Sequence, residues 1–343
     1  MSAVAAVIGA FEGAPLPDAV RRSAVRLLVA NASRSMQGAP ALDAAFAAEM
    51  ARRPIAEHAE AANEQHYEVP TAFFQHVLGP RMKYSCCRYP TGREALAQAE
   101  EIALAETCAH ADLRDGQRIL ELGCGWGSLS LWMAERYPDA EITSVSNSAT
   151  QRAFIEAAAQ AKGLANLRVV TADMNAFAPD RPGFDRIVSV EMFEHMANWR
   201  ALLTRARSWL KPEGALFLHV FSHRSTPYRF DREDPADWIA QHFFTGGVMP
   251  SHALIRQFAD LFAVDEAWTW SGVDYRRTAD QWLENFDVHA GEIMPILRET
   301  YGMDAKLWAR RWRLFFMATA GLFGYADGAE WGVSHYRLRP VNS

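Results

Sequence analysis

One stretch of this 343-residue chain constrains its fold more than any other: Ile119-Leu120-Glu121-Leu122 runs directly into Gly123-Cys124-Gly125-Trp126-Gly127. The apolar run is typical of a buried strand, and a helical pattern begins at Ser128. Glycine is required where φ is positive or where a ligand approaches the backbone, and the start of the following helix offers free N–H groups. The pattern predicts a strand, a tight turn and a helix that together bind a nucleotide or a carboxylate.

Apolar runs and helical stretches alternate around this turn, which is typical of a parallel sheet covered on both faces. The segments expected to form helices are 128–136, 149–162 and 199–210. The expected strands are 118–122, 141–145, 167–171, 185–190 and 215–221, with two later candidates near 262–270 and 331–338. The sequence therefore predicts an α/β fold with a doubly wound sheet.

The chain is expected to carry helical additions to this sheet. Residues 1–64 are rich in alanine and predict a helical N-terminal extension. Its apolar face packs against the protein in the main interpretation and touches a membrane surface in the alternative. Residues 65–343 are expected to form the main domain, with helical insertions at about 222–260 and 276–328 that shape a hydrophobic pocket. The face expected to be apolar holds Val20, Ala24, Leu27 and Leu28, opposite Arg22 and Arg26.

Charge and cysteine spacing exclude several classes of protein. The formal net charge of −6 argues against nucleic acid as a partner. No apolar run reaches membrane-spanning length, and the N-terminus lacks the basic flank of a signal peptide. We expect a cytoplasmic protein with no metal site, and the sequence leaves open whether two copies form a homodimer. The cysteines, which show neither disulfide nor zinc-site spacing, are Cys86, Cys87, Cys108 and Cys124.

The glycine spacing separates two kinds of nucleotide site. A dinucleotide site requires G-x-G-x-x-G and an acidic residue at the end of the second strand, whereas this chain has G-x-G-x-G and Asn147 there. Asn147 and Gln151 are candidate cofactor contacts, although Gln151 also completes a helix-capping box with Ser148. Asp173, at the end of the third strand, lies on the same edge of the sheet and could accept a hydrogen bond from an adenine amino group.

Several further blocks accompany the glycine turn. They are His66-Tyr67-Glu68-Val69-Pro70, Lys83-Tyr84-Ser85-Cys86, Ser146-Asn147-Ser148-Ala149-Thr150-Gln151, Glu191-Met192-Phe193-Glu194-His195-Met196, Phe243-Phe244-Thr245-Gly246-Gly247 and Trp331-Gly332-Val333-Ser334-His335. With these blocks, the chain from about residue 63 onward resembles the cyclopropane fatty-acid synthase superfamily of methyltransferases, most closely its coclaurine N-methyltransferase-type branch. The resemblance implies S-adenosylmethionine (SAM) as cofactor, held by Tyr84, Ser85, Gly123, Gly125, Asn147, Gln151, Asp173 and Met174.

Methyl transfer to an amine requires a proton acceptor. The transfer is an in-line displacement at a sulfonium, so positioning contributes most of the catalysis. An amine with a pKa of about 10 is neutral in only about one molecule in a thousand at pH 7, a penalty of roughly 4 kcal/mol. A base at the carboxyl end of the fourth strand would remove this penalty. The resemblance implies that Glu194 and His195 act as this base, with Tyr67, Glu68 and His335 in the same pocket.

The other branch of the superfamily supplies an alternative. Its cyclopropane synthases methylate an alkene of a lipid, and a bound bicarbonate takes the proton; the resemblance places the bicarbonate holders at Cys86, Glu194, His219 and Tyr275. Phe221 departs from that branch, which usually has a smaller aliphatic residue there. The first expectation is therefore N-methylation of a small, partly aromatic amine, and the alternative is methylation of an unsaturated phospholipid. A third reading, a SAM-binding regulator without catalysis, conflicts with the retained Glu194-His195 pair.

Overall fold

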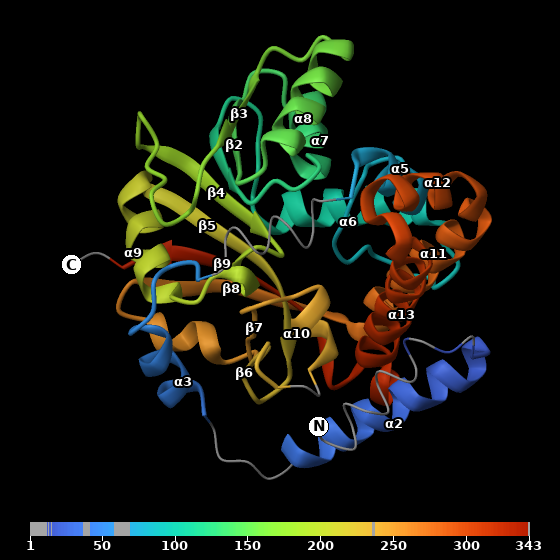
Figure 1. Ribbon diagram of the computed structural model, residues 1–343. Helices are drawn as coiled ribbons and strands as arrows, with labels where there is room; N and C mark the ends of the chain where they lie inside the picture. The colour runs from blue at the N-terminus through green and yellow to red at the C-terminus, as the bar shows by residue number, and fades with distance from the viewer. Residues whose placement is uncertain are drawn as a thin grey trace.

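The computed structural model describes residues 12, 14, 16–36, 42–57, 69–234 and 237–341. Its centre is a seven-stranded sheet with the order β3-β2-β1-β4-β5-β9-β8 (Figure 1). β1 to β5 run parallel, and β9 is antiparallel to both of its neighbours, β5 and β8. All of the expected strands are present: β1 (Arg118–Leu122), β2 (Glu141–Ser146), β3 (Leu167–Thr171), β4 (Phe184–Val190), β5 (Leu210–His223), β8 (Phe262–Ser271) and β9 (Trp331–Pro340).

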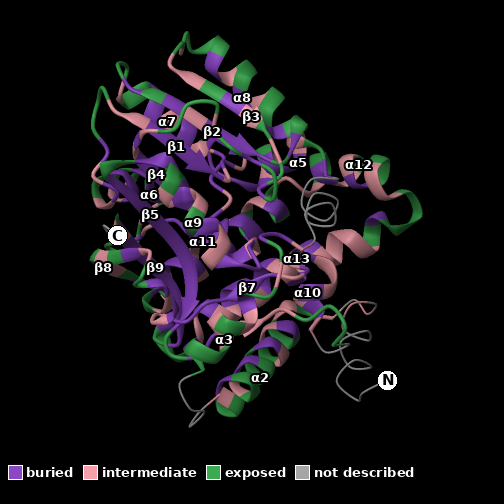
Figure 2. Cartoon of the chain, turned by 90° about the vertical axis from the view of Figure 1, so that its left-hand side faces the viewer, coloured by how far each residue is buried: buried purple, intermediate pink, exposed green. Residues whose placement is uncertain are grey.

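Helices cover both faces of this sheet, as the doubly wound prediction requires. Alternate residues of each strand point to opposite faces, so Ile119 packs with α6 and α7 whereas Leu120 packs with α9. Figure 2 shows the central strands almost wholly buried and the outer sides of the helices exposed, whereas the edge strands β3 and β8 also carry exposed residues. The helices around the sheet are α3 (Asp43–Met50), α6 (Leu96–His110), α7 (Ser128–Arg136), α8 (Ala149–Ala161) and α9 (Trp199–Trp209).

A second, largely helical layer lies beside the carboxyl ends of the parallel strands, and all of its helices except α5 follow β5 in the chain. α11, α12 and α13 form a group that packs with α5, and Figure 1 shows them in orange and red next to that helix. Their core is largely aromatic and includes Phe73, Trp282, Trp312 and Phe316. This layer consists of α5 (Thr71–Val77), β6 (Tyr228–Arg229), α10 (Trp238–His242), β7 (Val248–Met249), α11 (Gly272–Val288), α12 (Ala290–Tyr301) and α13 (Ala305–Phe323), with the short 3-10 segments η1 (Phe193–His195), η2 (Leu254–Phe258), η3 (Gly302–Asp304) and η4 (Tyr325–Gly328) around it.

The N-terminal helix α2 (Asp18–Met36) buries a different face from the expected one. Its buried residues are Arg21, Val25, Val29 and Ser33, whereas Val20, Leu27 and Leu28 are exposed. The expected apolar face was therefore wrong. The reason lies in α13, where Gly321 has no side chain and lets α2 approach at Val25: a Cβ on Gly321 would come within 2.4 Å of Val25 Cγ1. Two ion pairs also join α2 to the helices it packs against. Arg22 pairs with Asp280 of α11 at 2.8 Å, and Asp18 pairs with Arg313 of α13 at 2.5 Å.

Three further expectations concern membrane spans, cysteines and metal sites. The helices of the described residues include none that is long and apolar enough to cross a membrane. The four cysteines are free and buried. Within the same residues, no group of three or more histidine, cysteine, aspartate or glutamate side chains could hold a metal ion. The expected boundary at residues 64 and 65 lies outside the described part of the chain, and the division into two parts stays a prediction.

Candidate active site

A cavity of about 260 Å³ opens at the carboxyl ends of β1, β2, β3 and β4. This edge of a parallel α/β sheet is where such folds bind ligands. The cavity has a glycine-turn half, which touches the strand ends, and an aromatic half beneath the helical layer. The glycine-turn half holds all of the residues that were predicted to contact the cofactor: Tyr84, Ser85, Gly123, Gly125, Asn147, Gln151, Asp173 and Met174.

The three glycines of the turn have different tasks. Gly123, Gly125 and Gly127 all have positive φ, at 80°, 50° and 77°. A Cβ at Gly123 would lie 2.4 Å from Met192 Cγ, and one at Gly127 would lie 2.5 Å from Ile155 Cγ1. A Cβ at Gly125 would meet nothing within 4 Å, and Gly125 lines the cavity. Packing therefore requires the outer two glycines, whereas the middle one leaves room for a ligand against the backbone.

Gln151 combines a structural contact with a polar group left for a ligand. Its Oε1 accepts a hydrogen bond from Ser146 Oγ at 2.6 Å, and its backbone N–H donates to Ser148 Oγ at 3.3 Å. Ser148 therefore caps α8, as expected, but the side chain of Gln151 turns to Ser146 instead of closing the capping box. Its Nε2 is buried and has no partner among the described residues. A buried donor costs free energy unless it is satisfied, so this amide fits a ligand that brings an acceptor.

The segment before α6 supplies another wall of the same half. Lys83 Nζ donates to Ser85 Oγ at 2.5 Å and to the Cys86 carbonyl oxygen at 2.7 Å, which holds Ser85 in place. The Tyr84 ring packs against Trp282, with 5.4 Å between the ring centroids. On the opposite side, exposed Asp173 accepts from the Asn175 N–H at 2.8 Å. These contacts place polar groups on both sides of the glycine turn.

The sequence analysis missed Glu191, the first residue after β4. Its backbone has φ of 48°, and its carboxylate lies buried against the cavity. Oε1 accepts from the Cys86 N–H at 2.9 Å and lies 3.1 Å from His219 Nε2, while Oε2 accepts from the Tyr275 hydroxyl at 2.6 Å. Its place directly after an apolar strand, on the ligand-binding edge, is the signal that could have found it.

Glu194 lies deeper than Glu191. Its Oε1 accepts from the Phe221 N–H at 2.6 Å, and its Oε2 has no partner among the described residues. Burial, together with the negative charge of Glu191, raises the pKa of Glu194 well above its usual value. Burial also raises the pKa of Glu191, against the opposing effects of Lys83, the Tyr275 hydroxyl and the Cys86 N–H. Glu194 therefore holds its proton at pH values where an exposed carboxyl group is ionised, and Glu191, with donors around its carboxylate, is the easier of the two to ionise.

His195 lines the cavity at the boundary between its two halves, and its ring lies 4.4 Å from that of Phe244 between centroids. Two other predicted residues of the acceptor pocket, Tyr67 and Glu68, lie outside the described residues. His335 does not line the cavity, contrary to the expectation. It pairs with His219 across β9 and β5, so β5 separates its ring from the end of β4.

The residues expected to hold bicarbonate need a second correction. Cys86, His219 and Tyr275 do converge on one point, but they converge on the carboxylate of Glu191 rather than on a space beside Glu194. The positive φ of Glu191 turns its side chain toward these groups. The Cys86 N–H and the Tyr275 hydroxyl are thus already satisfied by a carboxylate of the chain itself, and His219 Nε2 lies within hydrogen-bond distance of the same group.

The aromatic half of the cavity is a cage of rings from distant segments. Phe230 and Phe244 meet edge to face with centroids 4.8 Å apart, and Tyr275 stacks on Phe323 at 4.2 Å. Phe221 lies 5.5 Å from Phe244 and joins the two pairs. Such rings suit a flat apolar group and attract a cation through their π faces. Phe230, Phe244, Trp282, Phe315, Tyr275 and Phe323 all line this half.

Comparisons with known proteins agree with this geometry. The family described as mycolic acid cyclopropane synthetase matches residues 55–327. The chain is 35% identical to (S)-coclaurine N-methyltransferase of Thalictrum flavum subsp. glaucum, over 82% of this chain and 79% of that protein. It is 31% identical to cyclopropane-fatty-acyl-phospholipid synthase of Escherichia coli strain K12, over 79% of this chain and 66% of that protein. Its structure is similar to that of coclaurine N-methyltransferase bound to N-methylheliamine and S-adenosylhomocysteine (SAH), the product of SAM. The TM-score is 0.94 at 29% identity, over 98% of this chain and 100% of that chain.

Proposed function

Because the chain belongs to the mycolic acid cyclopropane synthetase family and is a SAM-dependent methyltransferase, we propose that it methylates the nitrogen of a small, partly aromatic amine. One observation carries the proposal: a buried carboxylate of the chain, Glu191, lies beside an aromatic cage. A carboxylate and aromatic faces together favour a cation over an uncharged lipid chain. The relatives named for amine methylation support the same acceptor class.

The glycine-turn half fits SAM, which supplies a methyl group on a positively charged sulfur. Gly125 leaves the backbone open to a ligand, and Gln151 Nε2 is a buried donor that awaits an acceptor. Asn147 and Asp173 line the same half with groups able to bond a ribose or an adenine. We propose that these residues, with Tyr84, Ser85, Gly123 and Met174, hold the cofactor.

The acceptor amine must lose a proton before it can attack. Glu191 and the aromatic rings favour entry of the protonated amine, and His195 stands on the wall of the same cavity to take its proton. Burial and the negative charge of Glu191 raise the pKa of Glu194, so Glu194 keeps its own proton. It therefore does not compete for the proton of the amine, and Glu191 remains the charged carboxylate of the site. Rings such as Phe244 then contact the cationic product, a contribution of about 1–2 kcal/mol when it is desolvated.

The placement of Glu191 also argues against the lipid alternative. A bicarbonate ion would need the Cys86 N–H, His219 and the Tyr275 hydroxyl, which already serve Glu191. It would also bring a second negative charge next to that carboxylate in a buried site, which is costly without new donors. The internal carboxylate thus supports an acceptor that delivers a positive charge itself.

An acceptor panel tests the proposal. The purified protein is incubated with SAM and, separately, 1,2,3,4-tetrahydroisoquinoline, its oxygen analogue isochroman, and vesicles of an unsaturated phospholipid. Mass spectrometry should find one added methyl group on the amine and no product from the two others, because only the nitrogen compound offers a basic lone pair. Methylated phospholipid without any methylated amine would contradict the proposal.

We infer a simple arrangement for the rest of the chain. Residues 1–64 form an extension before the catalytic domain, and the packing of α2 on α13 supports an interpretation in which that extension braces the helical layer over the cavity. The cytoplasmic location and the homodimer remain predictions. Sedimentation at several protein concentrations tests the second of these.

A further inference from the structure

Three buried or half-buried histidines continue from Glu191 toward the surface. His219 Nε2 lies 3.1 Å from Glu191 Oε1, and His219 Nδ1 lies 2.9 Å from His335 Nε2. His335 Nδ1 lies in turn 2.8 Å from His110 Nδ1. Each distance is that of a hydrogen bond. The row links the wall of the cavity to the last residue of α6, where the side chain is only half-buried.

Strand register explains why these rings form a row. His219 on β5 pairs with Val190 on β4 and with His335 on β9, and His335 pairs with Trp268 on β8. Residues directly opposite each other share one face of a sheet, so the row crosses the sheet at right angles to the strands. The C-terminal end of α6 packs over the outer strands, where the His110 ring stacks on Trp268 at 4.0 Å. Glu191 ends the row because it directly follows Val190.

The three imidazoles are neutral at neutral pH. Burial lowers the pKa of all three, and for His219 and His335 it is lowered well below the usual value. A neutral imidazole has one donor and one acceptor nitrogen, which is what an unbroken chain of hydrogen bonds requires. Besides the other histidines of the row, the charged groups that act on these rings are Lys83 for His219, Lys83 and Arg88 for His335, and Glu106, Glu266, Arg88 and Arg337 for His110.

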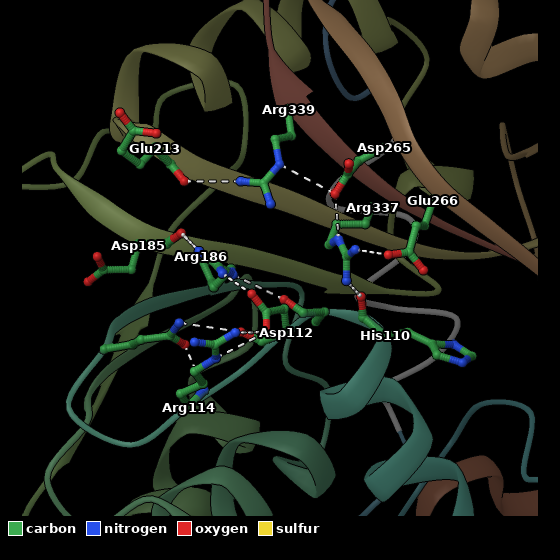
Figure 3. Close-up of polar contacts among 12 residues, drawn as sticks. His110, Asp112, Arg114, Asp185, Arg186, Glu213, Asp265, Glu266, Arg337 and Arg339 are labelled. Carbon is green, nitrogen blue, oxygen red and sulfur yellow. Dashed lines mark hydrogen bonds and ion pairs between the residues drawn. The ribbon is translucent and has the colours of Figure 1, made fainter.

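The outer end of the row is open. Within the described residues, His110 Nε2 has no hydrogen-bond partner. Figure 3 shows Arg337 engaged by Asp265, Glu266 and the backbone carbonyl of His110, while the imidazole ring is directed away from this network. The neighbouring guanidinium group is thus occupied by carboxylates, and the second ring nitrogen of His110 remains available to water.

We propose that Glu191, His219, His335 and His110 form a proton relay that carries the proton of the amine from the cavity to the surface. The inference rests on the proposed amine methylation. At neutral pH that reaction releases one proton per turnover, since a protonated amine loses an N–H proton, its nitrogen bonds the methyl carbon, and the electrons of the C–S bond return to sulfur. His195 takes this proton from the amine and gives it to the carboxylate of Glu191, which lines the same cavity.

The proton then moves by exchange along the row. His219 accepts a proton at Nε2 as its Nδ1 proton passes to His335 Nε2, and His335 gives its Nδ1 proton to His110 Nδ1. His110 releases its Nε2 proton to water, so the row gains and loses one proton. Neutral imidazoles interconvert between two tautomers, which returns the relay to its starting arrangement.

Kinetics can separate a relay from a structural role. His110→Ala and His335→Phe are compared with the unaltered enzyme, with 1,2,3,4-tetrahydroisoquinoline as acceptor. We expect the first turnover to keep its rate, because the buried carboxyl groups can store one proton, and later turnovers to slow by roughly 10- to 100-fold. The result is a burst of one product per site. A pH-indicator dye in stopped flow should show proton release lagging behind methyl transfer in both variants.

Added imidazole supplies the sharpest control. It should restore later turnovers in His110→Ala, whose gap lies at the surface, but not in His335→Phe, whose gap is buried. His76→Ala, a half-buried histidine of α5 outside the row, should behave like the unaltered enzyme. Unchanged affinity for SAH shows that the variants are folded. Equal slowing of the first and later turnovers, or full multiple-turnover rates in both variants, overturns the relay alone, whereas failure of the unaltered enzyme to methylate any amine overturns the proposed function.

Discussion

The two halves of the cavity are built from different parts of the chain. In the glycine-turn half, backbone geometry and polar side chains form much of the wall, and most of these residues follow β1, β2 or β3 within a few positions. In the aromatic half, large side chains form the wall, and they come from segments between Phe221 and Phe323. One half depends on local conformation and the other on how helices pack.

This difference suits the two proposed ligands: a cofactor of fixed structure in the glycine-turn half and an acceptor of variable structure in the aromatic half. A wall of backbone tolerates few substitutions, because Gly123 and Gly127 already have Met192 and Ile155 within 2.5 Å of an added Cβ. A wall of packed rings can change shape by exchange of one side chain for another. Glu191 and Glu194 lie between the two halves of the cavity, on the segment after β4. Substitutions should therefore affect the two halves in different ways.

The largest effect is expected at the boundary of the halves. His195→Ala should lower turnover of an amine by about 10²- to 10⁴-fold, the usual contribution of a general base. SAH affinity should stay nearly unchanged, and the loss should shrink as the pH rises and more amine is neutral in solution. Rates measured between pH 6 and 10 check this, with His289→Ala of the α11–α12 junction as control. A variant with the normal rate at pH 7 would show that another group takes the proton.

The glycine-turn half should be the more sensitive one for cofactor binding. Gly125→Val adds a branched side chain at a φ of 50° and fills open space on the cavity wall, so we expect SAH to bind about 100-fold more weakly. Calorimetry measures this change. Gly116→Val is the matched control, because Gly116 also has positive φ and open space but does not line the cavity. Equal losses in both variants would mean that backbone strain, not occupation of the site, is responsible.

A milder and different effect is expected in the aromatic half. Phe244→Leu should raise the KM for the amine by about 10-fold, through loss of roughly 1–2 kcal/mol of ring contact, and leave SAH affinity as it is. Phe177→Leu, a buried phenylalanine outside the cavity, serves as control. Weaker SAH binding in Phe244→Leu would show that cofactor binding and amine binding are not divided between the two halves.

The smallest effect concerns stability. The folded pKa of Glu194 is raised, so the ionised form is disfavoured in the folded state and stability is lost as the pH rises from the unfolded value toward the folded one. Glu194→Gln removes this loss. The variant should therefore gain stability over the unaltered chain by up to about 1 kcal/mol per pH unit above pH 5. Urea unfolding at pH 5, 6 and 7 measures the difference, and Glu299→Gln on exposed α12 should show none.

The glycine-turn half was predictable because its signals are local. The strand, the three glycines and the polar residues after β2 are read from consecutive positions, and the fold places them as expected. Glu191 lies within one of the sequence blocks but was not predicted as a site residue. Its contacts with Cys86, His219 and Tyr275 join segments that are far apart in the chain. Only the packed sheet and helical layer bring those groups together.

The N-terminal helix illustrates a second limit. An alanine-rich helix offers several weakly apolar faces, and the partner decides which one is buried. In α2 the partner is the small residue Gly321 on α13, which favours Val25 over Leu27 and Leu28. Likewise, a strand near 331–338 was expected from the sequence, but its place beside β5, which turns His335 toward His219, is a property of the sheet.

The most direct test of the central claim is a competition for one methyl group. The enzyme receives SAM labelled in the methyl carbon, together with 1,2,3,4-tetrahydroisoquinoline and vesicles of unsaturated phospholipid in the same tube, with and without bicarbonate. We predict that the label enters only the amine and that the rate is the same in both conditions, because Glu191 already occupies the donors that bicarbonate would use. Label in the phospholipid, at a rate that falls when bicarbonate is removed, would contradict the account.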